Sequence, residues 1–591
     1  MTPVQGWLPS PRAIRICLAC TFVFIGLLII TLFIHQLIFP LLAIFVPQLK
    51  TTFYDIAVYG GAPARRYHSL GSQSPELNVL RWDSRCDDDG QIFLGPYGPW
   101  VETPGPTILD ASGSLIWTMQ DFDLVTNFQM QEYKGEKFLT FWAGHKEGAK
   151  GKGAMYMLNS RYEIAHKLQA VGEGLYGDLH EFQLTNEGTA LITVYNDTIL
   201  DMRDFGFFRG EHGWATDCLF QEIDIETNEL LFQWVASENV RPADTHYVQP
   251  TAGFVESEPF DFFHINSIEK DSRGNYLISS RHFHTITYIE GGTGATLWTL
   301  GADSSDFVDV SENPGAATDF CWAHHARWLD EEEGIISLFD NGNAGPLHWD
   351  RSTSKGMLIQ VDQKKYTVKH LQDYKALNKV RSNSQGDLQY LEEKQEVFMG
   401  WGGSAMWTQH DIYGTLLCEV HFAPSLLYFL EKVKSYRVFK YWGWKGDPQW
   451  PPSAKIHEGK LYASWNGATE VRSWRVEGRR DDEEDVGKFE TIASADKLGF
   501  ETAIDLPQEG YSRFRAVALD GNHEVLNISD PVEPEEPESP LPIILGSCAG
   551  VLFVAGFVCL LRYLILRKVR LPAIFPWKRR PRWSAYEYSK L

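Results

Sequence analysis

The sequence predicts an all-β protein, and three observations carry that prediction. Apolar residues recur with period two, rather than 3.6, from about residue 76 to about residue 450. Aromatic residues make up 13% of the 591 residues and glycine is abundant, which is typical of a β-rich globular protein. One strand–turn–strand template also returns along the chain, and such repeats usually decide the architecture.

Each copy of the template is the end of one strand, a polar turn that usually carries glycine, and a strongly apolar strand. The copies are separated by about the length of one four-stranded sheet, which is typical of the blades of a β-propeller. Their span predicts six blades, with five or seven as alternatives. The copies are FQMQEYKGEKFLTF from Phe128, FQLTNEGTALITVY from Phe182, NSIEKDSRGNYLISS from Asn266, ARWLDEEEGIISLF from Ala326 and LEEKQEVFMG from Leu391.

A smaller β module is expected after the propeller. Its short alternating strands, with turn signals between them, resemble a fibronectin type III or immunoglobulin-like sandwich. An acidic, proline-rich linker follows it. The predicted order is a cytosolic N-terminus (1–12), a membrane anchor (13–46), a connector (47–75), the propeller (76–453), the sandwich (454–532), the linker (533–540), a transmembrane helix (541–566) and a basic cytosolic tail (567–591).

Two apolar runs predict membrane insertion at both ends of the chain. Ile14 to Ile34 is long enough to span a bilayer as a helix, and so is Leu541 to Leu566. Basic residues flank the outer side of each run, so both termini are expected in the cytosol. The large domain between them is then expected in the lumen or outside the cell. This predicts an integral membrane protein of the secretory pathway or cell surface.

Four cysteines lie between the two apolar runs, where an oxidising compartment would allow disulfides. They permit three pairings, and the sequence does not choose among them. Two Asn-X-Ser/Thr triplets, at Asn196 and Asn527, predict a glycoprotein. The four cysteines are Cys86, Cys218, Cys321 and Cys418.

The net charge of −23 argues against nucleic acid as a partner, because phosphate binding needs a basic face. No CxxC pair suggests zinc, and no phosphate-cradling glycine loop suggests a nucleotide donor. We therefore expect no cofactor and no metal. The lysine-rich stretch from Gly144 to Gly153 is interpreted as a flexible surface insertion.

The repeat predicts where the chemistry lies. Two residues before each copy stand Thr126, His180, His264, His324 and Gln389. Equivalent positions on the innermost strands of a propeller would line one central channel. Three histidines in that register are hard to explain by packing alone.

The stretch HINS with SSRH predicts an anion pocket. His264 and Asn266 share a strand face, and Arg281 lies on the next strand of the hairpin. A guanidinium beside an imidazole offers several donors to an anion. The alternative is an interior polar network that holds blades together. His180 is either a further ligand for the same anion or a channel histidine tied to Glu181 or to backbone.

Several segments in order resemble the arylsulfotransferase (ASST) family, in its fungal-type, membrane-associated branch. The resemblance spans roughly residues 74–475. It implies a six-bladed propeller that transfers a sulfuryl group from an aryl sulfate to a phenol through a transiently sulfated histidine. The segments are GDLHEFQLTNEGTALITVYN, FQEIDIETNELLFQW, FHINSIEKDSRGNYLISSRH, TGATLWTLG, HHARW, SLFDNGN and YASWNGATEVRSW.

By motif, the resemblance makes His324 the nucleophile, with His264, Arg281 and His180 as further catalytic residues and Asn266 as a substrate-binding residue. One departure is His325, which stands where this branch of the family usually has Asp. The alternative reading is a non-catalytic propeller that serves as a scaffold or receptor. Four tryptophans are candidates to stack an aryl ring, although core packing is their commoner role: Trp142, Trp298, Trp322 and Trp401.

Overall fold

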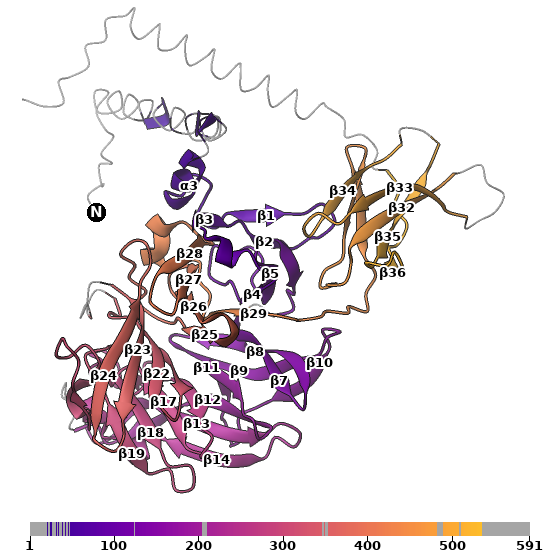
Figure 1. Cartoon of the computed structure of the whole chain (residues 1–591). Helices are drawn as coiled ribbons and strands as arrows, with labels where there is room; N and C mark the ends of the chain where they lie inside the picture. The colour runs from indigo at the N-terminus through magenta and orange to yellow at the C-terminus, as the bar shows by residue number, and fades with distance from the viewer. Residues whose placement is uncertain are drawn as a thin grey trace, which may run out of the picture. The chain divides into compact units, whose positions relative to one another are not determined.

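The chain is mostly β, which confirms the predicted class (Figure 1). The computed structural model describes residues 48–122, 124–203, 210–345, 348, 353–480, 488–507 and 510–534, with scattered positions between residues 21 and 46. The helix predicted at 541–566 and most of the anchor predicted at 13–46 lie outside these residues. Among the residues described, no helix is long and apolar enough to cross a bilayer.

The segment predicted as a connector contains a short helix and a β-ribbon. Helix α3 (Gln48–Asp55) buries Phe53 and Tyr54, and the Tyr54 hydroxyl donates to the Glu76 carbonyl at 2.6 Å. Strands β1 (Ala64–Arg66) and β2 (Gln73–Pro75) pair antiparallel. The connector is therefore folded against the domain that follows it.

From residue 78 to residue 441 the strands form successive sheets. The first has the order β29 (Val438–Tyr441), β4 (Gln91–Leu94), β5 (Thr107–Asp110) and β6 (Leu115–Thr118). The second joins β7 (Val125–Tyr133), β8 (Glu136–Glu147), β9 (Lys150–Leu158), β10 (Ile164–Leu168), β11 (Gly177–Leu184), β12 (Thr189–Leu200), β13 (Gly213–Asp224), β14 (Leu230–Val235) and β15 (Phe260–Asp261).

Three more sheets follow in chain order. One contains β16 (Ile265–Lys270), β17 (Tyr276–Ser280), β18 (Thr285–Ile289) and β19 (Thr296–Leu300). The next contains β20 (Val308–Asp309), β21 (His324–Asp330), β22 (Ile335–Asp340), β23 (Lys355–Asp362) and β24 (Thr367–Tyr374). The last contains β25 (Gln389–Leu391), β26 (Glu396–Gly400), β27 (Met406–Asp411), β28 (Leu416–His421) and β3 (Asn78–Arg81).

Every copy of the sequence template forms a hairpin, which explains its turn chemistry. In the β16–β17 hairpin, Asp271 accepts hydrogen bonds from the amides of Arg273 and Asn275. Gly274 has a φ of +83°, a conformation that a side chain would strain.

The lysine-rich stretch from Gly144 to Gly153 differs from its prediction. It extends the β8–β9 hairpin, in which Lys146 pairs with Gly151. The interpretation as a flexible insertion was wrong: the ladder of hydrogen bonds continues to Glu147 and Lys150.

Late and early parts of the chain are joined twice. Strand β29 pairs with β4, and β3 pairs with β28 (Figure 1). A disulfide joins Cys86 to Cys418, while Cys218 and Cys321 are buried and form no disulfide. Of the three two-bond pairings that the sequence allowed, only the one that contains Cys86–Cys418 is compatible with the structure, and its second bond is not formed. It reinforces the junction that the β3–β28 ladder already makes.

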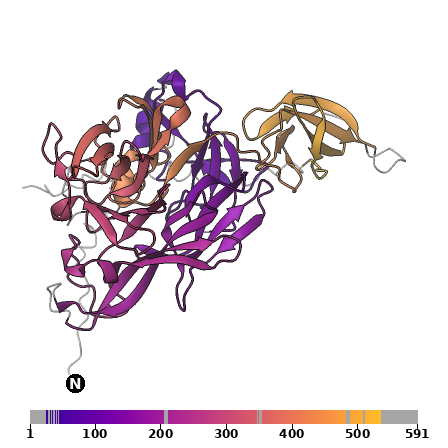
Figure 2. The ribbon, with the colours of Figure 1, turned by 60° about the horizontal axis from the view of Figure 1, so that its bottom comes forward.

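The C-terminal β module consists of two sheets with a common hydrophobic core (Figure 2). One sheet has the order β30 (Ser453–His457), β31 (Lys460–Ser464), β34 (Thr502–Asp505). The other has the order β33 (Glu490–Asp496), β32 (Ser473–Arg479), β35 (Arg513–Leu519), β36 (Val525–Ile528). Trp474 and Phe514 from the second sheet pack with Leu461 from the first.

A buried carboxylate ties the sheets of the larger domain together. Glu181, on β11, accepts hydrogen bonds from Arg437 at 2.7 Å and from Arg327 at 2.5 Å. It also accepts the amide of Ile268 on β16 at 3.2 Å. Burial alone would raise the pKa of Glu181, but the positive charges of Arg327 and Arg437 hold it below its usual range.

Removing this charge should destabilise the protein. Glu181→Gln leaves the buried guanidinium of Arg437 and the partly buried one of Arg327 without their counter-ion, so we expect a loss of about 3–5 kcal/mol in the free energy of unfolding, measured by denaturant titration. Because the folded pKa is depressed, this stabilisation is present above the unfolded pKa of glutamate and is lost as pH falls. The variant should therefore lose part of the wild-type sensitivity to acid. As a control, Glu226→Gln at an exposed pair with Lys134 should change little. Equal effects of the two substitutions would contradict the assignment.

Candidate active site

His324 opens strand β21 and has both ring nitrogens engaged. Its Nδ1 donates to the Asn341 side-chain oxygen at 2.7 Å and to the Trp322 carbonyl at 3.0 Å. Its Nε2 accepts the backbone amide of Gln385 at 3.1 Å. The proton is therefore assigned to Nδ1, and the lone pair of Nε2 is the reactive position.

His180 and His264 each have an aspartate at Nδ1. His180, on β11, is bonded to Asp178, and His264, just before β16, is 2.5 Å from the Asp261 carboxylate. Their rings lie 4.5 Å apart, edge to face. Within the described part of the chain, neither ring has a hydrogen-bond partner at Nε2. A carboxylate at Nδ1 fixes the ring and leaves Nε2 to exchange a proton.

Arg281 follows strand β17 and is held by two acceptors. One nitrogen donates to His282 Nε2 at 2.9 Å and another to the Asn383 carbonyl at 3.0 Å. His282 in turn donates through Nδ1 to the Asp261 carbonyl at 2.8 Å. The guanidinium also lies over the Trp322 ring, 5.2 Å from its centroid. These contacts fix the direction in which Arg281 points.

The structure brings the predicted catalytic residues together. The His264 ring is 4.5 Å from His282, the partner of Arg281. Tyr436 lies between the other two histidines, with its ring 5.7 Å from His180 and 6.5 Å from His324. His180 on β11, His264 just before β16, Arg281 just after β17 and His324 on β21 thus come from three successive sheets to one place.

Three buried polar atoms at this place have no partner among the described residues. They are Arg281 Nε, the Tyr436 hydroxyl and the Gln385 side-chain oxygen. Leaving a buried polar atom unsatisfied costs free energy, so each of these three atoms would gain from a ligand. Other unsatisfied buried atoms occur elsewhere among the described residues, and it is the grouping at the histidines that points to a site. Together with the free Nε2 atoms of His180 and His264, they offer both donors and acceptors to a small polar ligand.

Burial keeps His324 and His264 uncharged. It lowers the pKa of His324 well below the usual value, and the positive charge of Arg281 lowers it further. Burial also lowers the pKa of His264, with His180 and Arg281 adding to the effect. Both residues are less than 5% exposed. A neutral imidazole is the nucleophilic form, so the site is suited to attack by nitrogen.

The backbone is strained where it delivers these side chains. His264 has a φ of +64°, Trp322 +58° and His325 +56°. The β16–β17 and β21–β22 ladders both lose register at these points. Non-glycine residues in this conformation cost free energy and cluster at functional sites.

The His325 side chain lies outside the cluster. Its ring is 5.8 Å from the Phe439 ring and accepts the Leu388 amide at 3.4 Å.

Asn266 is fully buried and both ends of its amide are used. The nitrogen donates to the Ala323 carbonyl at 2.7 Å, and the oxygen accepts from the Ser279 hydroxyl. The side chain thereby links β16 to the residue before His324. The role of Asn266 in substrate binding stays a prediction. Its contacts favour a positioning role, because they hold the backbone next to His324.

Asp261, His264 and His282 place potential metal-ligating atoms within 4.8 Å of one another. Hydrogen bonds already use the ring nitrogens, because His264 donates to the Asp261 carboxylate and His282 donates to the Asp261 backbone carbonyl. The guanidinium of Arg281 beside His282 would also repel a cation. The group fits an orienting network better than a metal centre.

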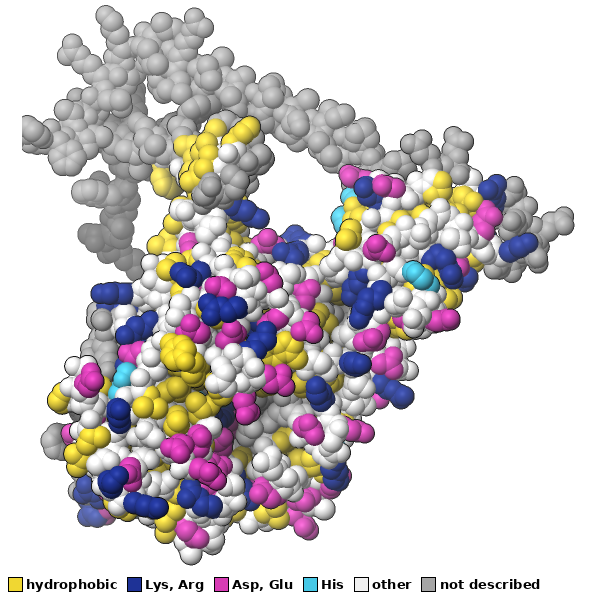
Figure 3. Space-filling view, viewed as in Figure 1, with side chains coloured by type: hydrophobic (Ala, Val, Ile, Leu, Met, Phe, Trp, Pro, Cys, Tyr) yellow, Lys and Arg dark blue, Asp and Glu magenta, His cyan; other side chains and the backbone are white. Residues whose placement is uncertain are grey.

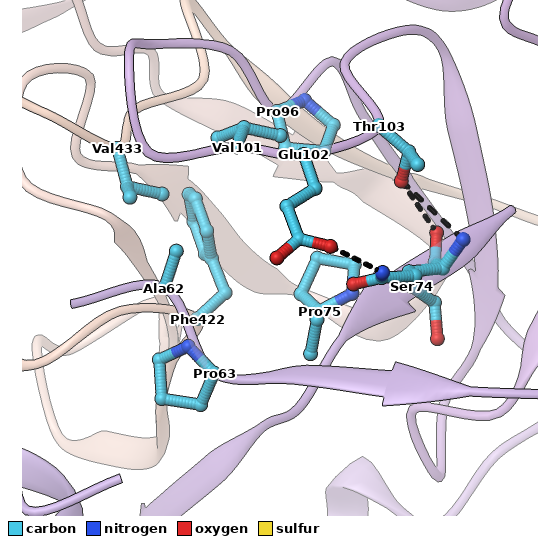
Figure 4. Close-up of a pocket in the computed structure, with 12 residues that line it drawn as sticks. Ala62, Pro63, Ser74, Pro75, Pro96, Val101, Glu102, Thr103, Phe422 and Val433 are labelled. Atoms are coloured by element: carbon cyan, nitrogen blue, oxygen red, sulfur yellow. Dashed lines mark hydrogen bonds between the residues drawn. The ribbon is translucent and has the colours of Figure 1, made fainter. Parts of the chain in front are cut away.

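A separate small pocket lies under the β1–β2 ribbon (Figure 4). Glu102 reaches toward it and accepts from the Gln73 side chain at 2.6 Å, with Phe422 and Val433 on the opposite wall. Its volume of about 40 Å³ has room for roughly one water molecule, not for an aryl ring.

The four candidate tryptophans are all buried. Of these four, Trp322 contacts the site, because the Arg281 guanidinium lies over its ring.

The residues that sequence reasoning missed are the partners of the predicted ones. Asp178 and Asp261 stand two and three positions before their histidines, a local signal that could have been read. Asn341 belongs to the quoted segment SLFDNGN. Tyr436 and Gln385 come from loops without a periodic pattern, so only the folded chain places them.

Of the comparisons with known proteins, the one with family models agrees with the resemblance. No curated protein matches the chain. Among solved structures, a protein of unknown function from Bacteroides caccae is 12% identical, with 56% of this chain and 93% of that chain covered and a TM-score of 0.33. The Cps50 (Swd1) β-propeller domain of Myceliophteria thermophila is 10% identical, with 68% and 95% covered and a TM-score of 0.30. Likeness at this level identifies no shared fold. Residues 129–423 match the model of the arylsulfotransferase (ASST) family. Through this region, which contains all the predicted site residues, the chain belongs to the arylsulfotransferase family.

Proposed function

We propose that this protein is a membrane-anchored arylsulfotransferase that moves a sulfuryl group from an aryl sulfate to a phenol through sulfo-His324. The observation that carries the proposal is the convergence of His324, His264, His180 and Arg281 around buried polar atoms that lack partners. The family supports an aryl substrate of small size. The fungal-type branch of the family belongs to the same proposal.

The architecture that we propose for this chemistry is a six-bladed propeller. The nine-stranded sheet then counts as two blades, because β7–β10 and β11–β14 are each four strands in sequence. Pairing of β29 with β4 would close the ring. The C-terminal sheets, with orders β30-β31-β34 and β33-β32-β35-β36, fit a fibronectin III-like sandwich.

In the first half-reaction, His324 Nε2 attacks sulfur. A nitrogen–sulfur bond forms as the bond from sulfur to the aryl oxygen breaks, and the electron pair leaves with the phenolate. The negative oxygens of the transferring group need donors that are already in place. Arg281 Nε and the Tyr436 hydroxyl are unused donors at the site. The Gln385 amide must first release the lone pair of Nε2.

Proton movement falls to His264. An arriving sulfate anion favours its protonated form, which then gives the Nε2 proton to the leaving phenolate. In the second half-reaction the neutral ring takes the proton of the acceptor phenol, whose oxygen attacks sulfur as the bond to His324 breaks. Asp261 stabilises the imidazolium and keeps the Nδ1 proton in place. His180 with Asp178 offers a second group of the same kind.

A non-catalytic binding protein is the second candidate, and one observation favours it. His324 Nε2 is covered by the Gln385 amide, and His325 replaces the aspartate that is usual at that position. A protein that only binds anions would keep the donors and have no need of an exposed nucleophile.

Covalent labelling separates the two candidates. Incubation with an aryl sulfate, without acceptor, should add one sulfuryl group to His324, detected by mass spectrometry of peptides kept at alkaline pH. His324→Ala should abolish both the label and transfer to phenol. His325→Asn is the matched control, because that ring lies outside the cluster, and it should still be labelled. Label on another residue, or none on the wild type, would remove the proposed mechanism.

Asp261→Asn tests the proton path. The amide cannot hold the Nδ1 proton of His264 in the same way, so transfer to a phenol should slow by roughly 10²-fold. The loss should grow as the pKa of the acceptor phenol rises, because a less acidic phenol needs the base more. Asp217→Asn, at a buried carboxylate bonded to Ser237, is the control. A loss that is the same for all phenols would indicate a structural role only.

We also propose that the large domain lies in the lumen or outside the cell, with both termini cytosolic. The apolar runs and the Cys86–Cys418 disulfide support this placement. In acid-quenched cells, Cys86 and Cys418 should resist a maleimide–polyethylene glycol label until they are reduced. Cys86→Ser should expose Cys418 and produce one added label. Reaction of both thiols in the unreduced wild type would place the domain in a reducing compartment.

A further inference from the structure

The β8–β9 hairpin brings a lysine next to an aromatic ring near the site. Lys146, on β8, is half-buried, and its ammonium lies 5.9 Å from the centroid of the Tyr97 ring. The ammonium of Lys434 lies 5.8 Å from the same centroid. Tyr97 and Lys434 also exchange both backbone hydrogen bonds, at 2.9 and 3.0 Å. Two cations therefore flank one buried tyrosine.

The charges at this place are not balanced. Lys434 pairs with Glu431 at 3.0 Å, whereas no carboxylate among the described residues lies within 4.0 Å of the Lys146 ammonium. Burial and the charge of Lys434 lower the pKa of Lys146 to about 8, against smaller opposite effects of Glu431 and Asp178. A cation in this position is destabilised until an anion joins it.

Hydrogen bonds connect this pair to the proposed reacting atom. The Tyr97 hydroxyl accepts from the Gln385 side chain at 2.7 Å, and the Gln385 amide donates to His324 Nε2. In the same loop, Asn383 accepts from Arg281 at 3.0 Å and donates to Glu431 at 3.1 Å. Lys146 also adds to the depression of the pKa of His264, which agrees with its nearness to the site.

The chain as a whole carries a negative charge, which repels anions at long range. The net charge is −23, and acidic and basic side chains are interspersed on the face drawn in Figure 3. Attraction of a negative substrate must therefore come from local cations. Arg281 faces the sulfuryl group in the proposed reaction, so the lysine pair is left for another negative group.

We propose that Lys146 and Lys434 form an anion-binding subsite for a second negative group, so that the preferred substrates are aromatic sulfate esters that also carry a carboxylate or a second sulfate. This rests on the proposed function, since it assigns the first sulfate to Arg281 and His324.

Binding of unreactive sulfonates tests the subsite without turnover. Benzenesulfonate carries one charge and 4-sulfobenzoate carries two, and isothermal titration calorimetry on the full chain in detergent gives both affinities. The wild type should bind 4-sulfobenzoate about tenfold more tightly, the size expected of one partly buried ion pair. This preference should decline as pH rises above about 8, where Lys146 loses its proton.

Variants locate the effect. Lys146→Gln should remove the preference and leave the affinity for benzenesulfonate unchanged, whereas Lys146→Arg should keep it. Lys152→Gln is the control, because Lys152 pairs with His145, the neighbour of Lys146 on β8, and forms an ion pair with Glu147 at 3.0 Å. Equal affinities in the wild type, no binding of either ligand, or an equal loss of both in Lys146→Gln would overturn the proposal. Absence of sulfuryl transfer with the preference intact would reject the proposed function but not the subsite.

Discussion

The larger domain depends on one fully buried carboxylate. Glu181 stands on β11, yet its oxygens receive donors from β16, β21 and the residue before β29. Arg437 extends the same contact to the carbonyls of His180 and Asn266. Burying a charge costs free energy unless all its hydrogen-bond partners are in place, so few arrangements of these strands are stable. Because Arg437 also binds the backbone of His180 and Asn266, the network fixes the positions of these two residues.

Much of the candidate site could be predicted from the repeat in the sequence. The register placed His180, His264 and His324 at the same point of successive copies, and the structure brings them into one cluster with Arg281. The all-β class followed from period-two patterning. The membrane runs, the branch of the family and the residue roles remain predictions, because the described residues do not test them.

The rest could not be read from pattern, for physical reasons. The positive φ of His264 and the loss of ladder register beside it redirect a side chain that simple alternation would place elsewhere. Asn266 looked like a ligand residue because its polar end shares a face with His264, but it satisfies Ala323 and Ser279 instead. The lysine-rich stretch looked like a loop because composition cannot show that glycine and lysine continue a ladder between two long strands.

The double junction between early and late strands has a consequence for how the protein is made. Strand β4 cannot find its neighbour β29 until more than 300 further residues have left the ribosome, as the positions of these strands require. During that time its edge is open, and an unpaired edge invites association with other chains. Contacts of such long range also slow folding. The Cys86–Cys418 bond closes over the same interval, so oxidation and ring closure become one late event in biosynthesis. A stalled or shortened chain that lacks β29 would therefore expose the unpaired edge of β4 and would not form a smaller stable domain.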